Sequence, residues 1–332
     1  MKIVYIVFGL IVMALSVPVS GSSSPVPKGE YLGQAPPGTE PAVFAPGFVS
    51  TGLGERDAAF TPDRKEFYFT VVLERFTAIV VTRQGTDGTW SKPEVAPFSG
   101  RYSDIEPCIS PDGKRFYFVS KRPPGEGKEA PEFFSIWLME RSGSGWTSPR
   151  NPGAPINGEW NVFYPSVTRD GTLYYTRGHN DGSEYIYRSR LTEGKYGEPE
   201  KLGHGVNTTN NQFNAFIAPD ESYLIVSVFG RKDSVGRTDY YVTFRSKDDR
   251  WSGPINLGDR INTPGTEYTP YVTPDGKYFF FNRMQGKLAD GDPGKRLNYE
   301  EITERSRQWG NGAGDLYWVD AAVIEKLKPK SR

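Results

Sequence analysis

The sequence predicts an all-β protein, a five-bladed β-propeller of four-stranded antiparallel blades, with six blades as the nearest alternative. Three observations lead to this prediction. A hairpin pattern recurs five times, and aromatic residues are abundant, with 20 Phe, 19 Tyr and 7 Trp among 332 residues. The chain also contains 37 Gly and 27 Pro, while long helical periodicity is almost absent. Many short strands joined by tight turns have this composition.

The repeated unit consists of a short apolar strand, a turn of the Pro-Asp-Gly-Lys type and a strongly aromatic second strand. Asp-Gly favours a tight turn, and alternating aromatic and β-branched residues favour two paired strands. We therefore expect each copy to form a hairpin. The five turn aspartates are Asp63, Asp112, Asp170, Asp220 and Asp275.

The rest of each repeat supplies two more strands. A third strand pattern, such as FSIWLMER around Trp137, follows each hairpin. In the first four repeats an aromatic turn, such as WSKP at Trp90, then precedes a short apolar segment. We interpret these aromatic residues as side chains that hold the turn in place. Four antiparallel strands per repeat are typical of a propeller blade.

The fifth repeat ends differently, because after DLYWVDA the chain continues as AVIEKLKPK, a short helical tail without a fourth strand. The stretch EPAVFAPGFVSTGLGE from Glu40 is similar to KPEVAPFSGRYSDIEP from Lys92, which leads from a fourth strand into the next repeat. We therefore expect residues 40–49 to pair beside residues 316–320. This strand would complete the last blade and close the ring.

The N-terminal residues 1–21 have the pattern of a secretory signal peptide, with Lys2, an apolar run and then small residues. The run is shorter than the roughly 20 residues that a membrane-spanning helix needs. We expect an exported protein, periplasmic or extracellular, without membrane insertion. Residues 22–39 are predicted to be a flexible segment, and residues 40–332 a single propeller domain with a short C-terminal helical tail. Since Cys108 is the single cysteine, no disulfide is expected to hold the fold.

Two copies of the hairpin, SPDGKRFYFVSKR and TPDGKYFFFNR, resemble the Pro-Asp repeat of the TolB-like, WD-repeat-like β-propeller family. The resemblance covers all five repeats, roughly residues 40–320. Two copies depart from it, with Arg169 in place of the proline and Glu221 in place of the glycine. The resemblance implies an extracytoplasmic binding or interaction scaffold, and it carries no single set of catalytic residues.

The start of the first strand and the end of the second lie at one end of a hairpin, opposite its turn. Residues eight and six positions before each turn aspartate are therefore expected on one face of the ring, close to the basic residues that follow the second strand. Paired carboxylates and guanidinium groups at the mouth of a central channel form a polar binding surface. The candidate ligand-binding residues are Glu55, Asp57, Asp104, Glu106, Tyr164, Gln212, Asn214, Glu267, Arg122, Arg177, Arg231 and Arg283.

The leading functional hypothesis is a binding or protein-interaction scaffold that uses this polar face for a protein, a polar polysaccharide or a glycopeptide. The alternative is a glycoside hydrolase or lyase with two catalytic carboxylates. A third interpretation, that the charges only pair between blades, stays open. The candidate catalytic carboxylates of the enzyme hypothesis are Glu55, Asp57, Asp104, Glu106 and Glu267.

Composition argues against other classes of function. Forty basic residues balance 40 acidic ones without a basic block, so the charge pattern of a nucleic-acid-binding protein is missing. The chain has no GxSxG segment and only two histidines, His179 and His204, which argues against serine hydrolysis and zinc chemistry. We expect no cofactor and no metal, although the HNDGSE turn at Asp181 leaves calcium open.

Overall fold

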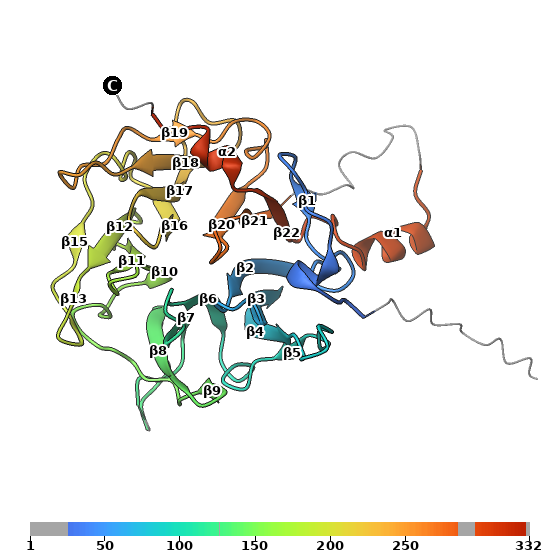
Figure 1. Ribbon diagram of the computed structural model, residues 1–332, viewed down its shortest axis with the longest axis horizontal. Helices are drawn as coiled ribbons and strands as arrows, with labels where there is room; N and C mark the ends of the chain where they lie inside the picture. The colour runs from blue at the N-terminus through green and yellow to red at the C-terminus, as the bar shows by residue number, and fades with distance from the viewer. Residues whose placement is uncertain (1–25, 126, 285–295, 330–332) are drawn as a thin grey trace, which may run out of the picture.

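The computed structural model describes residues 26–125, 127–284 and 296–329. Five four-stranded antiparallel sheets surround a central channel, with the first strand of each blade innermost (Figure 1). The five-bladed prediction is confirmed, and the six-bladed alternative is wrong. The predicted signal peptide, residues 1–21, lies outside the described residues. None of the helices that the structure describes is long and apolar enough to cross a membrane.

The strands follow the chain order within each blade, except that β1 belongs to the last blade. Blade 1 contains β2 (Gly54–Phe60), β3 (Glu66–Leu73), β4 (Phe76–Arg83) and β5 (Glu94–Val95). Blade 2 contains β6 (Asp104–Ile109), β7 (Arg115–Ser120), β8 (Ser135–Ser142) and β9 (Gly145–Trp146). Blade 3 contains β10 (Val162–Val167), β11 (Leu173–Gly178), β12 (Glu184–Ser189) and β15 (Glu200–Lys201). Blade 4 contains β16 (Gln212–Ile217), β17 (Tyr223–Phe229), β18 (Thr238–Phe244) and β19 (Ile255–Asn256).

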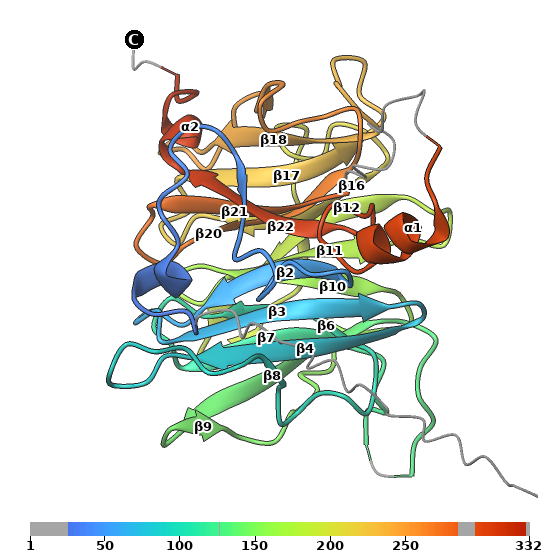
Figure 2. The same ribbon diagram turned by 90° about the vertical axis from the view of Figure 1, so that its right-hand side faces the viewer.

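Blade 5 is completed by the N-terminal strand β1. It contains β20 (Glu267–Val272), β21 (Tyr278–Arg283), β22 (Asp315–Asp320) and β1 (Ala42–Val43). Strand β1 pairs antiparallel with β22, with Ala42 opposite Trp318, and the two labels lie side by side in Figure 1. In Figure 2 the blue N-terminal segment passes over β22. The next residue, Phe44, donates its backbone N–H to the Leu316 carbonyl at 2.8 Å, and its ring is fully buried. The predicted closure of the ring by residues 40–49 is therefore confirmed.

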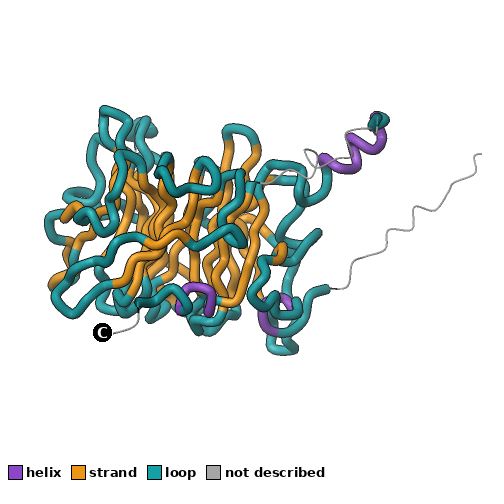
Figure 3. Tube along the Cα trace, turned by 90° about the horizontal axis from the view of Figure 1, so that it is seen from above, coloured by secondary structure: helices purple, strands orange, loops and turns teal. Residues whose placement is uncertain are grey.

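The remaining elements lie outside the blades. They are the 3₁₀ helix η1 (Glu30–Gly33), the helices α1 (Tyr299–Ser306) and α2 (Ala322–Glu325), and the hairpin β13–β14 (Leu191–Thr192 and Lys195–Tyr196). Figure 3 shows α1 beyond one face of the ring and the other two helical segments at the opposite face.

The segment before β1, for which the sequence predicts flexibility, packs against the two blades that meet at the closure. The Tyr31 ring lies 5.4 Å from the ring of Phe60 in blade 1 and 4.8 Å from that of Tyr278 in blade 5. Its hydroxyl donates a hydrogen bond of 2.8 Å to the turn aspartate Asp275. Burial of an aromatic ring whose hydroxyl is hydrogen-bonded stabilises this segment. The segment therefore forms a second contact between blades 1 and 5, in addition to β1.

The repeated aspartates have a structural role in their turns. Asp63 accepts hydrogen bonds from the Thr61 hydroxyl at 2.6 Å and from the Lys65 backbone N–H at 3.1 Å. Asp112 accepts the same two bonds from Ser110 and Lys114. An aspartate that bonds its own backbone two residues on stabilises a tight turn, which explains why the residue recurs in every blade.

The aromatic residues of the WSKP-type turns reach the preceding blade. Trp146 of blade 2 donates its indole N–H to the Tyr68 hydroxyl of blade 1 at 3.0 Å. The hydroxyl groups of Tyr196, in the hairpin β13–β14 that follows β12 of blade 3, and Tyr117 in blade 2 lie 2.7 Å apart. These contacts join one blade to the next, so the structural interpretation of the turn aromatics is confirmed for these two residues.

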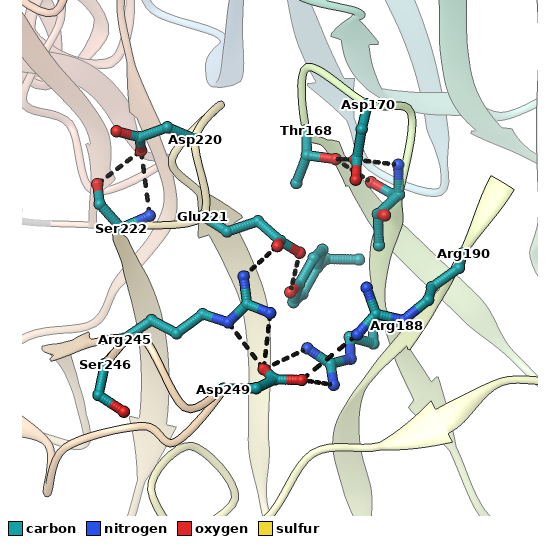
Figure 4. Close-up of polar contacts among 12 residues, drawn as sticks. Thr168, Asp170, Arg188, Arg190, Asp220, Glu221, Ser222, Arg245, Ser246 and Asp249 are labelled. Atoms are coloured by element: carbon teal, nitrogen blue, oxygen red, sulfur yellow. Dashed lines mark hydrogen bonds and ion pairs between the residues drawn. The ribbon is translucent and has the colours of Figure 1, made fainter.

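An ion-pair network joins blades 3 and 4 (Figure 4). The buried guanidinium of Arg188 contacts the Glu200 carboxylate at 2.9 Å and the Asp249 carboxylate at 2.7 Å. Arg245 pairs with Asp249 and Glu221, and Glu221 accepts a hydrogen bond from the Tyr174 hydroxyl of blade 3. The network lies between the blades rather than at the channel, so we assign it to stability.

Candidate functional site

The two faces of the ring differ in the part of the hairpin that they carry. We call the face with the hairpin turns the turn face, and the face where the first strands begin the strand-start face. The sequence predicts the functional site on the strand-start face. The structure allows each of the predicted residues to be placed relative to the channel.

In blades 1, 4 and 5, the residue eight positions before the turn aspartate bonds the loop that leads into the blade. Glu55 accepts hydrogen bonds from the backbone N–H and the hydroxyl of Thr51, and Glu267 accepts the same pair from Thr263. In blade 4, Gln212 accepts the Thr209 backbone N–H at 2.9 Å. These buried carboxyl and amide groups accept hydrogen bonds from the backbone of the preceding loop, which is a structural role.

Burial dominates the protonation of two of these carboxyl groups. It raises the pKa of Glu55 to about 8 and that of Glu267 to about 7, although hydrogen bonds from the adjacent threonines oppose both shifts. A carboxyl group held in a polar loop by its neighbours has little freedom to meet a ligand. These two residues are therefore weak candidates for catalysis.

Two of the predicted arginines pair with these acids. Arg122 contacts Asp104 at 2.7 Å, and the Arg283 guanidinium lies 3.6 Å from Glu267. Asp104 also accepts the Ser99 hydroxyl at 2.9 Å. Both arginines also donate to backbone carbonyl groups of the preceding loops. Asp104, Glu267 and their arginines thus form buried ion pairs within single blades.

The other two predicted arginines lie in different surroundings. Arg231 pairs with Asp233, two residues further along the same loop, at 2.8 Å. Arg177 has no acidic partner among the residues that the structure describes, and its guanidinium carbon lies 3.7 Å from the centre of the Trp160 ring. Arg177 therefore differs from the rest of the predicted basic set.

The residues six positions before the turn aspartates form the inner layer of the ring. Each has a left-handed backbone conformation, and in every blade the pairing between the first two strands shifts register at this point. A residue of this kind in a bulge redirects its side chain relative to a regular strand. All five side chains are buried. They are Asp57 (φ 64°), Glu106 (φ 59°), Tyr164 (φ 54°), Asn214 (φ 50°) and Thr269 (φ 64°).

Two carboxylates of this layer converge on one arginine. Arg56 Nε lies 2.9 Å from Asp57, and Arg56 Nη2 lies 2.6 Å from Glu106. Asp57 also accepts the Glu106 backbone N–H at 3.2 Å, and Glu106 accepts the backbone N–H of Tyr164. The structure therefore brings the acidic pair Asp57 and Glu106 together across blades 1 and 2. Arg56 was not among the predicted site residues.

Glu106 has a strongly perturbed carboxyl group. Burial raises its pKa to about 8, Arg56 opposes the shift and the negative charge of Asp57 adds to it. The raised pKa favours the protonated form of Glu106 at neutral pH. Its carboxyl oxygens are bonded by Arg56 and by the backbone N–H of Tyr164.

A cavity of about 170 Å³ extends from this inner layer to the turn face. Asp57, Glu106 and Tyr164 line its inner end, which we call the channel floor, and Phe60, Phe216 and Tyr271 contribute to its walls. Its rim is formed by turn residues. They are Pro62, Pro111, Arg169, Pro219 and Pro274.

The cavity therefore opens on the face opposite to the one where the sequence places the site. The residues just before the bulge positions do not line it; they are Arg56, Ile105, Phe163, Phe213 and Tyr268. Tyr164 lies at the inner end of the cavity, and its hydroxyl donates a hydrogen bond to the Pro270 carbonyl of blade 5 at 2.9 Å. In the sequence, this rim is marked only by the prolines that recur before the turn aspartates.

The described residues contain no group of three or more His, Cys, Asp or Glu side chains placed to hold a metal ion. In the HNDGSE turn, Asp181 accepts hydrogen bonds from the backbone N–H and the hydroxyl of Ser183. These bonds account for Asp181 as part of a tight turn.

No protein-family model matches the sequence, and no curated protein matches it. Several solved structures are similar to the chain at low identity. TolB from Acinetobacter baumannii is 15% identical over 80% of this chain and 57% of its own, with a TM-score of 0.45. The catalytic domain of a GH62 α-L-arabinofuranosidase from Coprinopsis cinerea is 12% identical over 86% of this chain and 97% of its own, with a TM-score of 0.48. The native arabinanase of Bacillus subtilis is 13% identical over 80% and 93% of the two chains, with a TM-score of 0.45.

At such identities the likeness concerns the fold alone. The similar structures include a TolB protein and two glycoside hydrolases, and propellers of one architecture carry many functions. The comparisons therefore do not choose between a binding protein and an enzyme.

Proposed function

We propose that the protein is a binding propeller that takes an apolar side chain of a partner protein into the turn-face cavity. The observation that carries this proposal is the cavity itself, with its proline rim, aromatic walls and polar floor. Small-molecule and peptide sites are concave and mostly apolar, with a few placed polar groups that fix orientation. The predicted signal peptide would put this activity in the periplasm or outside the cell.

The charged residues of the strand-start face also favour a binding protein over an enzyme. The carboxyl groups of Glu55, Asp104 and Glu267 are held by threonine, serine or arginine side chains of their own blades. A catalytic acid needs room for a substrate within hydrogen-bond reach. These three groups are instead occupied by the protein, which favours a scaffold over an enzyme at that face.

A substitution in the wall that fills the cavity tests this proposal. Cys108 lines the cavity and is the single cysteine of the chain, so Cys108→Phe adds a ring there while Cys108→Ala leaves the space open. Partners captured by the wild-type protein from an extract of its own cell envelope should be lost with Cys108→Phe and kept with Cys108→Ala. Thermal unfolding must first show that both variants fold. Equal capture by two folded variants would exclude the cavity as the binding site.

A second candidate function rests on the acidic pair of the channel floor. Asp57 and Glu106 share Arg56 and lie at the inner end of the cavity, and Glu106 has a raised pKa. Two carboxyl groups with different protonation are the requirement for glycoside hydrolysis. A screen of glycans with product detection tests this candidate. Turnover that Glu106→Gln abolishes would replace the scaffold proposal, whereas binding without any product would exclude the enzyme.

A further inference from the structure

Blade 3 lacks an ion pair that blade 5 has between its first two strands. In blade 5, Glu267 lies directly across the hairpin from Arg283, and their charged groups are 3.6 Å apart. In blade 3 the same register position places Val162 directly across from Arg177. Val162 is fully buried and apolar, so Arg177 has no acid across the hairpin at the position where Arg283 has Glu267.

Stacking holds Arg177 in place instead of an ion pair. Its guanidinium carbon lies 3.7 Å from the centre of the Trp160 ring and 5.5 Å from that of Tyr187. Within the described part of the chain, Arg177 forms no ion pair, and its Nε is buried without a hydrogen-bond partner. The indole N–H of Trp160 is also buried and unpaired. An arginine stacked on an aromatic ring keeps the outer edge of its guanidinium group available for a planar anion.

The neighbouring charges add to a positive potential. Lys201 is exposed, and its Nζ lies 3.0 Å from the centre of the Tyr185 ring on the same strand-start side of blade 3. Burial, Arg177 and Lys201 together lower the pKa of His179, whose ring lies 5.5 Å from that of Tyr185. The acid that acts on His179 in the opposite sense is Asp181, which already accepts hydrogen bonds from Ser183. Two cationic side chains and one acid therefore act on His179.

We infer that Arg177 is the anchor of a binding site for the carboxylate of an acidic sugar, with the partly exposed Trp160 and Tyr185 rings beside it. A guanidinium group binds a carboxylate through two parallel hydrogen bonds. Aromatic rings provide flat apolar surfaces against which a sugar ring packs, and Lys201 offers a second cation for the next acidic residue of a chain. This site lies on the strand-start face and is independent of the turn-face cavity.

The inference is tested by calorimetric titration with trigalacturonate near pH 7 at moderate salt. Arg177→Gln should weaken binding by about tenfold or more, the loss expected for a charge-assisted pair. Arg75→Gln is the control, because Arg75 is an exposed arginine in the turn after the second strand of blade 1, on the same face of the ring. Equal loss in the two variants, or no binding by the wild-type protein, would overturn the site.

Two further arms keep the inference falsifiable. Val162→Glu should restore the pairing seen between Glu267 and Arg283 and abolish binding, provided that thermal unfolding shows a folded variant. The fully methyl-esterified trisaccharide should bind at least tenfold more weakly, because it lacks the negative charge. A triglutamate peptide that binds as tightly as trigalacturonate would contradict the sugar specificity. Tight binding of the ester would contradict the carboxylate anchor.

Discussion

The hydroxyl of Tyr164 in blade 3 donates a hydrogen bond of 2.9 Å to the backbone carbonyl of Pro270 in blade 5. Blades 3 and 5 are not neighbours in the ring, so this bond spans the central channel. It joins two opposite walls and forms part of the channel floor.

Replacing Tyr164 by Phe should keep the ring and remove this bond. The Pro270 carbonyl then loses a buried partner, and we expect the free energy of unfolding to fall by about 1–2 kcal/mol. Urea denaturation measures the change. Tyr185→Phe is the control, because its hydroxyl makes only an exposed contact of 3.3 Å with Asn210. Equal effects of the two substitutions would show that the channel-spanning bond adds no stability.

The closure of the ring should depend on Phe44. Its ring is fully buried and lies 4.8 Å from Phe280 and 5.2 Å from Trp318. Phe44→Ala should lower the free energy of unfolding by about 3–5 kcal/mol, as for other buried aromatic residues. Phe76→Ala, at a side chain that is 40% exposed, should cost less than about 1 kcal/mol. A small effect at Phe44 would mean that β1 contributes little to closure.

The ion-pair network between blades 3 and 4 should add to stability through Arg188. This side chain is 4% exposed and bonds Glu200 and Asp249. Figure 4 shows its contact with Asp249. Arg188→Met should lower the free energy of unfolding by about 1–3 kcal/mol, the range for hydrogen bonds to charged groups. Arg250→Met serves as the control, since its pair with Asp248 is exposed and should contribute less than about 1 kcal/mol.

The stability of the protein should decline as the pH rises from about 5 to 8. Burial raises the pKa of Glu106 and of Glu55 to about 8, above the ordinary value of 4.5 that each recovers on unfolding. In this window the folded state holds more protons than the unfolded state, so raising the pH favours unfolding. Below the ordinary value both states are protonated and the slope vanishes.

The Glu106→Gln variant should show a shallower decline over the same window, because one of the buried carboxyl groups no longer titrates. Unfolding free energies at half-unit steps of pH measure the slope. Glu140→Gln removes a carboxyl group that is 54% exposed and should leave the slope unchanged. A wild-type slope in Glu106→Gln would show that this carboxyl is already ionised at low pH.

The order of blades and the closure of the ring followed from the sequence alone. Both depend on local chemistry, since each Asp-Gly turn and each aromatic strand lies within one repeat. The sequence also predicted that the last repeat lacks a fourth strand and that residues from Glu40 supply it. This was possible because the sequence of β1 is similar to that of another fourth strand. The pairing of Ala42 with Trp318 confirms the predicted closure of the ring.

The location of the candidate site depended on tertiary structure. The contact between Asp57 and Glu106 is made between two blades, and the bond from Tyr164 to Pro270 joins residues 106 positions apart. Nothing in one repeat shows which face such contacts leave open. The same limit applies to Arg177. The sequence shows a valine at Val162, but only the strand register places that valine across from the arginine and so leaves a charge without its acid.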